Sequence, residues 1–305
     1  MVDPNREWES ATPGDPAPTP NRLAALGRGL DAGYLRLRHK LCCTREKLLA
    51  RRGTRQRILF SNHDGWEKPI RLGFENTGHH IHFDRFTPES VRGYDMVVPL
   101  SIEDALFMDG NPDLLPDNPL PIPSAKAIAI CDDKVRFHQT LTELGYSAYL
   151  PPMEGELGYP HILKKKVDQW GQSCVVIHNP RQEAEHQNLL QTPDYFRQRM
   201  VPGYDEYATH MLMKNGRLLR DLNIRYHFNT PTPIKGQDTI AWMRRCPSTH
   251  RERFVKILKD LDYDGLCCFN YKHDEQGQPL IFEINPRFGG SLSRYFFGFV
   301  RHLCR

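Results

Sequence analysis

Two apolar segments near the end of the sequence constrain its fold more than any other feature. They span residues 264–271 and 279–285 and lie on either side of a short polar turn, which predicts a β-hairpin. The second segment runs directly into Glu-Ile-Asn-Pro-Arg-Phe-Gly-Gly-Ser, residues 283–291. Glu283 and Asn285 are two residues apart, so both point to the same side of a strand. A carboxylate beside an amide oxygen suits Mg²⁺ that bridges nucleotide phosphates, and the sequence therefore predicts a metal site at this strand end.

Further groups around the same strand end can bind a phosphoryl oxygen. Asn270, on the partner strand of the hairpin, can face the same space as Glu283. Arg287 carries a planar fork that can hold a carboxylate or a phosphoryl oxygen. Residues 289–291, Gly-Gly-Ser, allow a ligand to approach the backbone closely. A hairpin with a purely structural role needs none of these groups, so we expect this protein to bind ATP and magnesium.

Two lysine-bearing segments upstream point to the same chemistry. Lys134 opens a predicted helix capped by Asp132 or Asp133, and the free N–H groups of a helix start favour an anion. Lys164 ends a predicted strand, and a turn bearing Gly171 leads on to a second strand. A strand, a turn and a strand can form a flap over phosphates. From its residues alone, the second segment is equally consistent with an exposed basic hairpin.

The first 56 residues differ in composition from the rest of the chain. Residues 1–20 hold five prolines among small polar residues and are expected to be a disordered tail. Residues 21–52 place leucines three and four positions apart, which predicts an amphipathic helix whose other face is strongly basic. We assign this basic segment to residues 21–56. Such a helix can pack on the body, pair with a second copy or dock on an anionic partner. Nucleic acid is the least favoured partner, because no aromatic residues interleave with the charges.

Residues 57–124 alternate short apolar strands with helices, which predicts a Rossmann-like α/β domain. Strands are expected at 58–60, 80–83 and 94–100, and helices at 70–76 and 102–108. No Gly-x-Gly-x-x-Gly follows the first strand, so a dinucleotide is not indicated. Proline-rich residues 111–123 predict a rigid loop to a second body.

The order of these motifs resembles that of the ATP-grasp superfamily. The matching segments are Asp-Lys at 133–134, Pro-x-Ile-Leu-Lys at 160–164, Pro-Gly-x-Asp-Glu at 202–206, and the motif at 283–291. The resemblance spans roughly residues 125–291, and residues 57–124 are similar to the α/β domain that precedes the grasp. It implies an α/β protein, with an α+β grasp of two subdomains over residues 125–305. The smaller lid subdomain is expected at about 149–203.

The resemblance also implies which residues bind ATP. Lys134 and Lys164 match the lysines that hold the α- and β-phosphates, and residues 168–173 match the loop that lies over them. The hinge whose backbone reads adenine matches Gln198, Arg199, Met200 and Val201. Asp205 or Glu206 stands where a carboxylate binds the ribose hydroxyls.

Other matching residues are implied to take part in the reaction. Arg225 is expected near the γ-phosphate, and Arg287 matches the residue that steadies the reacting carboxyl phosphate. The implied metal ligands are Glu283, Asn285 and Asn270. At the last of these positions the superfamily normally has Asp or Glu, and an amide oxygen can coordinate Mg²⁺ but brings no charge. The phosphate loop is also poor in glycine, with Gly171 alone.

The implied activity is an ATP-dependent ligation of a carboxylate to an amine, with either substrate a small molecule or borne on a polymer. Asn270 and the glycine-poor loop leave open a nucleotide-binding protein without ligation, and a kinase-like enzyme is a third possibility. The net charge of +4 does not demand a nucleic acid as a partner. The sequence contains no apolar run of 18 residues, so no membrane span is predicted. The polar first ten residues and the cysteine spacing fit a cytoplasmic protein with reduced thiols.

Overall fold

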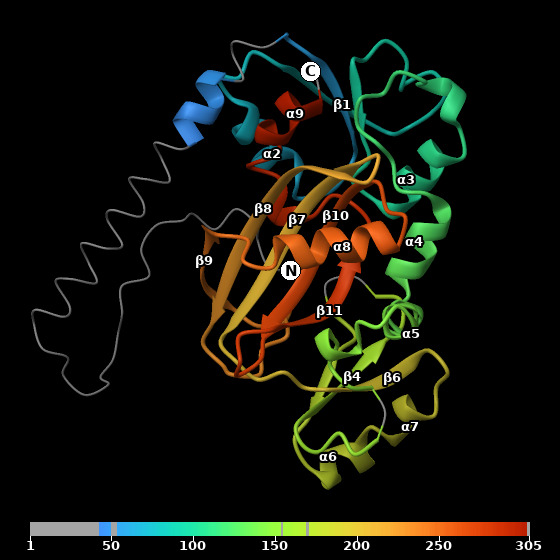
Figure 1. Cartoon of the computed structure of the whole chain (residues 1–305), viewed down its shortest axis with the longest axis vertical. Coiled ribbons are helices and arrows are strands. Elements are labelled where there is room, and N and C mark those ends of the chain that lie inside the picture. The colour runs from blue at the N-terminus through green and yellow to red at the C-terminus, as the bar shows by residue number, and fades with distance from the viewer. Residues whose placement is uncertain (1–42, 50–53, 154, 169–170, 304–305) are drawn as a thin grey trace, which may run out of the picture.

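The computed structural model describes residues 43–49, 54–153, 155–168 and 171–303 (Figure 1). The expected disordered tail, residues 1–20, and most of the expected basic helix lie outside these residues. No helix within the described part of the chain is long and apolar enough to cross a membrane.

Residues 43–49, the described part of the basic segment, are helical and contact the body. Glu46 pairs with Arg220 at 2.6 Å, and Lys47 Nζ donates to the Leu72 carbonyl at 3.2 Å. These seven residues therefore pack on the protein. Docking of the segment on an anionic partner, or on a second copy, stays a prediction.

The first unit of the structure is a small parallel sheet. Its elements are β1 (Arg57–Ser61), α2 (Glu67–Phe74), β2 (His80–Asp84), β3 (Met96–Val98), α3 (Ile102–Asp109) and the 3₁₀ turn η1 (Pro112–Leu114). β1 lies in the middle and pairs in parallel with both neighbours. Its Leu59 and Phe60 point to opposite faces, and both are fully buried, so both faces of this sheet are covered. The expected strands and helices are thus present, while the Rossmann-like assignment of residues 57–124 stays a prediction.

A larger antiparallel sheet forms the centre of the molecule, in the strand order β11-β10-β7-β8-β9. Its strands are β7 (Asp205–Lys214), β8 (Arg217–Phe228), β9 (Ile240–Cys246), β10 (Gly265–His273) and β11 (Pro279–Asn285). The helical elements around it are α4 (Ala125–Asp132), α5 (Lys134–Glu143), η2 (Ser147–Tyr149), α8 (Arg251–Asp260), η3 (Gly290–Leu292) and α9 (Phe297–Leu303). The expected hairpin of residues 264–285 is confirmed as β10 and β11.

The two faces of this sheet carry separate hydrophobic cores, because side chains alternate along each strand. On one face, Ile224 and Phe228 pack with Phe60 of the first unit and with α9. On the other face, Phe269 packs with α4, α5 and α8, and its ring stacks on that of Phe254 at 4.2 Å. Figure 1 shows α8 crossing the near face of the sheet. The small parallel sheet and the central sheet therefore share one continuous core.

A third sheet, of three antiparallel strands, lies at the far end of the molecule from the first unit (Figure 1). It comprises β4 (His161–Lys165), β5 (Val175–Ile177) and β6 (Tyr195–Arg199), with the short helices α6 (Pro180–Glu185) and α7 (Gln187–Leu190). Its apolar cluster is small and centres on Ile162, Cys174 and Met200. The predicted basic hairpin is therefore two strands of a separate small sheet, which brings Lys164 to the edge of the central one.

Candidate functional site

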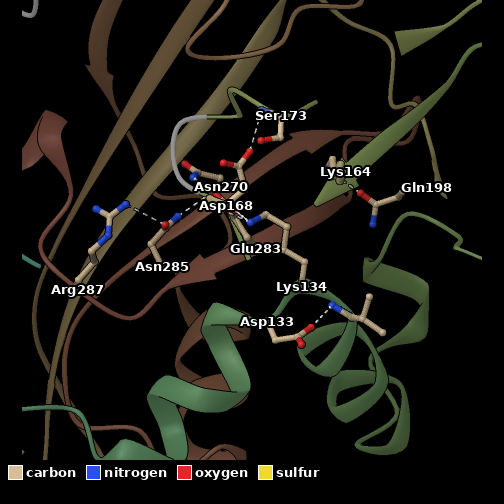
Figure 2. Close-up of polar contacts among 11 residues, drawn as sticks. Asp133, Lys134, Lys164, Asp168, Ser173, Gln198, Asn270, Glu283, Asn285 and Arg287 are labelled. Carbon is tan, nitrogen blue, oxygen red and sulfur yellow. Dashed lines mark hydrogen bonds and ion pairs between the residues drawn. The ribbon is translucent and has the colours of Figure 1, made fainter. Parts of the chain in front are cut away.

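Glu283 is the centre of a polar cluster at the end of the central hairpin (Figure 2). β10 and β11 pair Asn270 directly with Glu283, and Asn285 follows on the same strand. Glu283 Oε1 accepts hydrogen bonds from Asn270 Nδ2 at 2.7 Å and from Asn285 Nδ2 at 2.8 Å, while Oε2 pairs with Lys134 Nζ at 3.4 Å. The three residues predicted as metal ligands therefore lie together.

The neighbours of Glu283 stabilise its ionised form. Burial alone raises the pKa of a carboxyl group, but here Lys134 and the two amide donors outweigh it and lower the pKa of Glu283 to about 2. The side chain is 23% exposed, so it is enclosed yet still reachable by a ligand. Glu283 is therefore a carboxylate at every physiological pH.

Lys134 joins the central sheet to the third sheet. Asp133 is the N-cap of α5, and its Oδ1 accepts from Val135 N at 2.9 Å and Arg136 N at 3.0 Å, so Asp133 and not Asp132 caps this helix. The cap fixes Lys134 in the first turn, from which Nζ donates to the Asp168 carbonyl at 3.0 Å and reaches Glu283. The loop after β4 and the end of β11 that carries the predicted metal ligands thus meet at the Lys134 ammonium group.

Lys164 approaches from β4 and is held by Gln198 on the adjacent strand β6. Lys164 Nζ donates to Gln198 Oε1 at 2.8 Å and lies 5.0 Å from the centre of the Phe282 ring. Burial lowers the pKa of Lys164 below its ordinary value, and the charge of Glu283 is close enough to oppose this shift. The two predicted phosphate lysines therefore come from different elements and converge on the same space.

The predicted adenine hinge follows β6 and is fastened by a residue that sequence reasoning missed. Met200 and Val201 are buried, whereas Arg199 is exposed. Lys272, on β10, donates its Nζ to the carbonyls of Val201 and Gly203, each at 3.0 Å. Burial lowers the pKa of Lys272 to about 8. The hinge backbone is thus tied to the central sheet by one buried lysine.

Lys235, in the connection between β8 and β9, is a second residue that the sequence did not reveal. Its Nζ donates to Asn270 Oδ1 at 3.0 Å, pairs with Glu206 at 3.4 Å and lies 4.2 Å from the centre of the Tyr226 ring. Burial opposes its charge, but Tyr226 and Glu206 together raise the pKa of Lys235 above its ordinary value. Of the two carboxylates proposed for the ribose, the structure brings Glu206 to the cluster.

Arg225 and Asp205 are not brought to the cluster, in contrast to expectation. Ile224 and Tyr226 on β8 face the core shared with the first unit, so Arg225 points to the opposite face of the sheet. There it pairs with Asp205, which also bonds His227 at 2.8 Å. The alternation along β8, which long-range packing sets, therefore turns Arg225 away from Asn270, whereas Lys235 reaches Asn270 from the β8–β9 connection.

Arg287 and the Gly-Gly-Ser segment form the side of the cluster nearest the first unit. Arg287 donates to Asn285 Oδ1 at 3.3 Å, and its guanidinium lies 5.8 Å from the Trp66 ring centre. Ser291 Oγ bonds Nε2 of the buried His210 at 2.7 Å. A Cβ on Gly289 would lie 2.4 Å from His210 Cε1, so close approach alone requires glycine here. His210 had no recognisable sequence signal, because it sits inside an apolar strand.

The phosphate loop is held from the β8–β9 connection. Gln237 Nε2 donates to the Gly171 carbonyl at 2.7 Å and to the Cys174 carbonyl at 3.0 Å. Gly171 has a φ of +62°, which favours glycine, and a Cβ there would lie 3.0 Å from the Lys235 carbonyl. The single glycine of this loop thus stands where the loop closely approaches the β8–β9 connection.

The residues present fit one magnesium ion better than a metal centre built by protein alone. Within the described part of the chain, no group of three or more His, Cys, Asp or Glu side chains could hold a metal. Glu283 Oε2 and Asn285 Oδ1 are hard oxygen donors on one strand, and Mg²⁺ commonly uses one or two protein ligands together with phosphate oxygens. A metal here would therefore need a bound nucleotide to complete its coordination.

Several solved structures share the architecture of this chain. D-alanine–D-alanine ligase from Bacillus anthracis has a TM-score of 0.52 at 14% identity and covers 77% of this chain and 88% of that chain. L-amino acid ligase from Bacillus licheniformis has a TM-score of 0.51 at 15% identity, and the match covers 80% of this chain and 70% of the ligase. N5-carboxyaminoimidazole synthetase from Staphylococcus aureus, solved with ADP, has a TM-score of 0.52 at 15% identity, and the match covers 78% of this chain and 72% of the synthetase.

No family model matches the sequence, and no curated protein matches it either. At identities of this size, the structural likeness establishes the fold and not the substrates. The expected resemblance is confirmed at that level: the chain has the ATP-grasp fold, and its structural neighbours are ATP-grasp ligases.

Proposed function

We propose that this ATP-grasp chain is an ATP-dependent ligase that activates a carboxylate as an acyl phosphate and joins it to an amine. The observation that carries the proposal is the meeting of Lys134, Lys164 and Lys235 around Glu283 and Asn285. Three ammonium groups around one carboxylate form a site for a polyphosphate with a bound divalent cation. Two structural neighbours are named as ligases and one was solved with ADP, which supports ATP as the nucleotide here.

The reaction divides into two displacements. A carboxylate oxygen of the first substrate attacks the γ-phosphorus of ATP, and ADP leaves. The amine of the second substrate then attacks the acyl carbon, phosphate leaves, and the amine loses a proton. Neither displacement needs a covalent bond to the protein, so its residues act by position and charge.

Individual residues of the site have distinct parts in these steps. Lys134 and Lys164 hold the α- and β-phosphates and so fix ATP between the third sheet and the central sheet. Glu283 and Asn285 would hold Mg²⁺, which would supply neutralising charge to the phosphoryl oxygens. Arg287, beside Asn285, steadies the carboxyl phosphate while the amine attacks. Glu206 binds the ribose hydroxyls, and the backbone of residues 198–201 binds adenine.

ADP release is the direct test of this proposal. Release that requires both a carboxylate and an amine would support ligation. We expect Glu283→Gln and Lys164→Met each to abolish turnover. The matched controls are Glu275→Gln, in the exposed turn of the same hairpin, and Lys165→Met, whose side chain points away from Lys164 on the strand. Unchanged turnover of the Glu283 variant would refute the assigned metal site.

One observation favours a second candidate. Asn270 brings no charge and its oxygen is already bonded to Lys235, as suits a protein that holds a nucleotide without ligating. Tight ATP binding without turnover across a broad substrate panel would favour this candidate. ADP formation with a stable phosphorylated product would instead indicate a kinase-like enzyme.

A further inference from the structure

Asn270 is bonded at both ends of its side-chain amide. Its Nδ2 donates to Glu283 at 2.7 Å, and this fixes the orientation of the amide. Its Oδ1 then faces the Lys235 ammonium and accepts a hydrogen bond from Nζ at 3.0 Å. The same oxygen also accepts a weaker hydrogen bond from Cys268 Sγ at 3.9 Å. The oxygen that would have to bind a metal ion is therefore already directed at a positive charge.

A metal ion bound by Asn270 would lie too close to that charge. Mg²⁺ binds oxygen at about 2.1 Å. An ion at that distance from Asn270 Oδ1 would lie within about 5 Å of the Lys235 ammonium, because Nζ is itself only 3.0 Å from the same oxygen. Repulsion between a divalent ion and an ammonium at this distance is strong in an enclosed site, and the neutral amide supplies no charge to offset it. Cations also lie near the other two ligands, with Lys134 3.4 Å from Glu283 Oε2 and Arg287 3.3 Å from Asn285 Oδ1. Both of these contacts are longer, and an ion held there has the negative charge of Glu283 to offset the repulsion.

We propose that this site holds a single Mg²⁺ with ATP, bound by Glu283 and Asn285, and that the ammonium of Lys235 takes the place a second metal ion would need at Asn270. This inference rests on the proposed binding of ATP. Lys235 then supplies to the phosphates the positive charge that a second metal would otherwise bring.

Lys235 is built into the site and is not a chance surface contact. Glu206 pairs with its Nζ at 3.4 Å, the Tyr226 ring lies beneath it, and its side chain is only 25% exposed. Its backbone carbonyl also packs against Gly171 of the phosphate loop. A lysine held from several sides keeps its ammonium in one place, as a substitute for a metal ion must.

The charge balance of the cluster also suits one metal ion. Five cationic side chains surround it, Lys134, Lys164, Lys235, Lys272 and Arg287, against the two carboxylates Glu206 and Glu283. With ATP⁴⁻ bound, the formal excess of three positive charges becomes −1. One Mg²⁺ brings the site to +1, close to neutral, whereas a second would bring it to +3.

Metal counting tests the inference without any turnover. The full chain is saturated with a non-hydrolysable ATP analogue and titrated with Mn²⁺, and bound Mn²⁺ is counted by electron paramagnetic resonance. We expect one tightly bound ion per chain in the wild type and in Asn270→Asp, because Lys235 would pair with the new carboxylate. The double variant Asn270→Asp with Lys235→Met should bind two. The control Asn285→Ala should weaken the one ion of the wild type at least tenfold.

The outcomes separate the two proposals. Failure of the wild type to bind the analogue would refute the proposed function and this inference with it. Binding of the analogue with two tight Mn²⁺ ions, or with none, would overturn the inference and leave ATP binding intact. A double variant that folds, by its melting temperature, and still binds one ion would also refute the role of Lys235. If that variant does not fold, the number of Mn²⁺ ions bound by the wild type decides whether the inference stands.

Discussion

Replacing Gly289 by alanine should destabilise the protein through one identifiable clash. The added Cβ would lie 2.4 Å from His210 Cε1 and 2.9 Å from Nδ1. The ring cannot move away cheaply, because it is fully enclosed in the central sheet and bonded to Ser291 at 2.7 Å. One extra methyl group in such a place costs about 1–3 kcal/mol. Each kcal/mol lowers the melting temperature of a domain of 150–250 residues by about 2–4 °C.

The partner of the clash can be removed independently. His210→Ala deletes the ring, so in that background Gly289→Ala should cost almost nothing beyond the loss of His210 itself. The expected coupling free energy of the double variant is at least about 1 kcal/mol, as for residues in direct contact. Gly298→Ala is the matched control, because its Cβ would meet nothing closer than 3.5 Å and it lies in α9.

Differential scanning calorimetry of the four chains and the control measures these effects. Gly298→Ala should leave the melting temperature unchanged or raise it, since alanine is the better helix former. Equal losses from Gly289→Ala in the wild-type and His210→Ala backgrounds would refute the clash as the cause. Turnover of Gly289→Ala should also fall, because the Gly-Gly-Ser backbone shifts with it.

Three further predictions concern the hinge, the loop and the core. ATP affinity should weaken as pH rises through about 8, because the Lys272 ammonium that bonds the hinge carbonyls then loses its proton. Isothermal titration calorimetry measures this, and the ATP affinity of Lys272→Met should not change with pH around 8. Gln237→Ala should raise the KM for ATP severalfold and speed proteolysis near Gly171, since the backbone carbonyls of Gly171, Gln172 and Cys174 lose a donor; an unchanged KM would contradict this. Phe254→Ala should cost about 3–5 kcal/mol of stability in chemical denaturation, because its ring stacks on Phe269, and should leave the ATP affinity of the folded protein unaltered.

The parts of the site that were predictable from the sequence depend on local geometry. Glu283 and Asn285 must share a side of one strand, so this pair was recognisable without the fold. The aspartates before Lys134 are a local capping signal, but only the structure shows that Asp133 and not Asp132 is the cap. The boundaries were less accurate: the third strand of the first unit is shorter than expected, and α4 was not predicted as a separate helix.

The residues that were missed depend on contacts between distant segments. Lys235 lies in a polar connection without periodicity, and only the pairing of β8 with β9 brings it to Asn270. Arg225 was assigned to the site because it lies on a strand of the right region, but the face it occupies is decided by which neighbours take up the core. Roles that need a bound ligand, such as adenine contacts of residues 198–201, remain predictions.

The double attachment of Lys134 has a thermodynamic consequence. Its ammonium bonds the Asp168 carbonyl, at the start of the predicted phosphate loop, and pairs with Glu283, the predicted metal ligand. Any movement of the loop that draws Lys134 away would remove the main cation that keeps Glu283 ionised. By reciprocity, displacement of Lys134 and protonation of Glu283 are coupled by the same free energy in either direction. A cation bound at Glu283 would be coupled to the position of the loop in the same way.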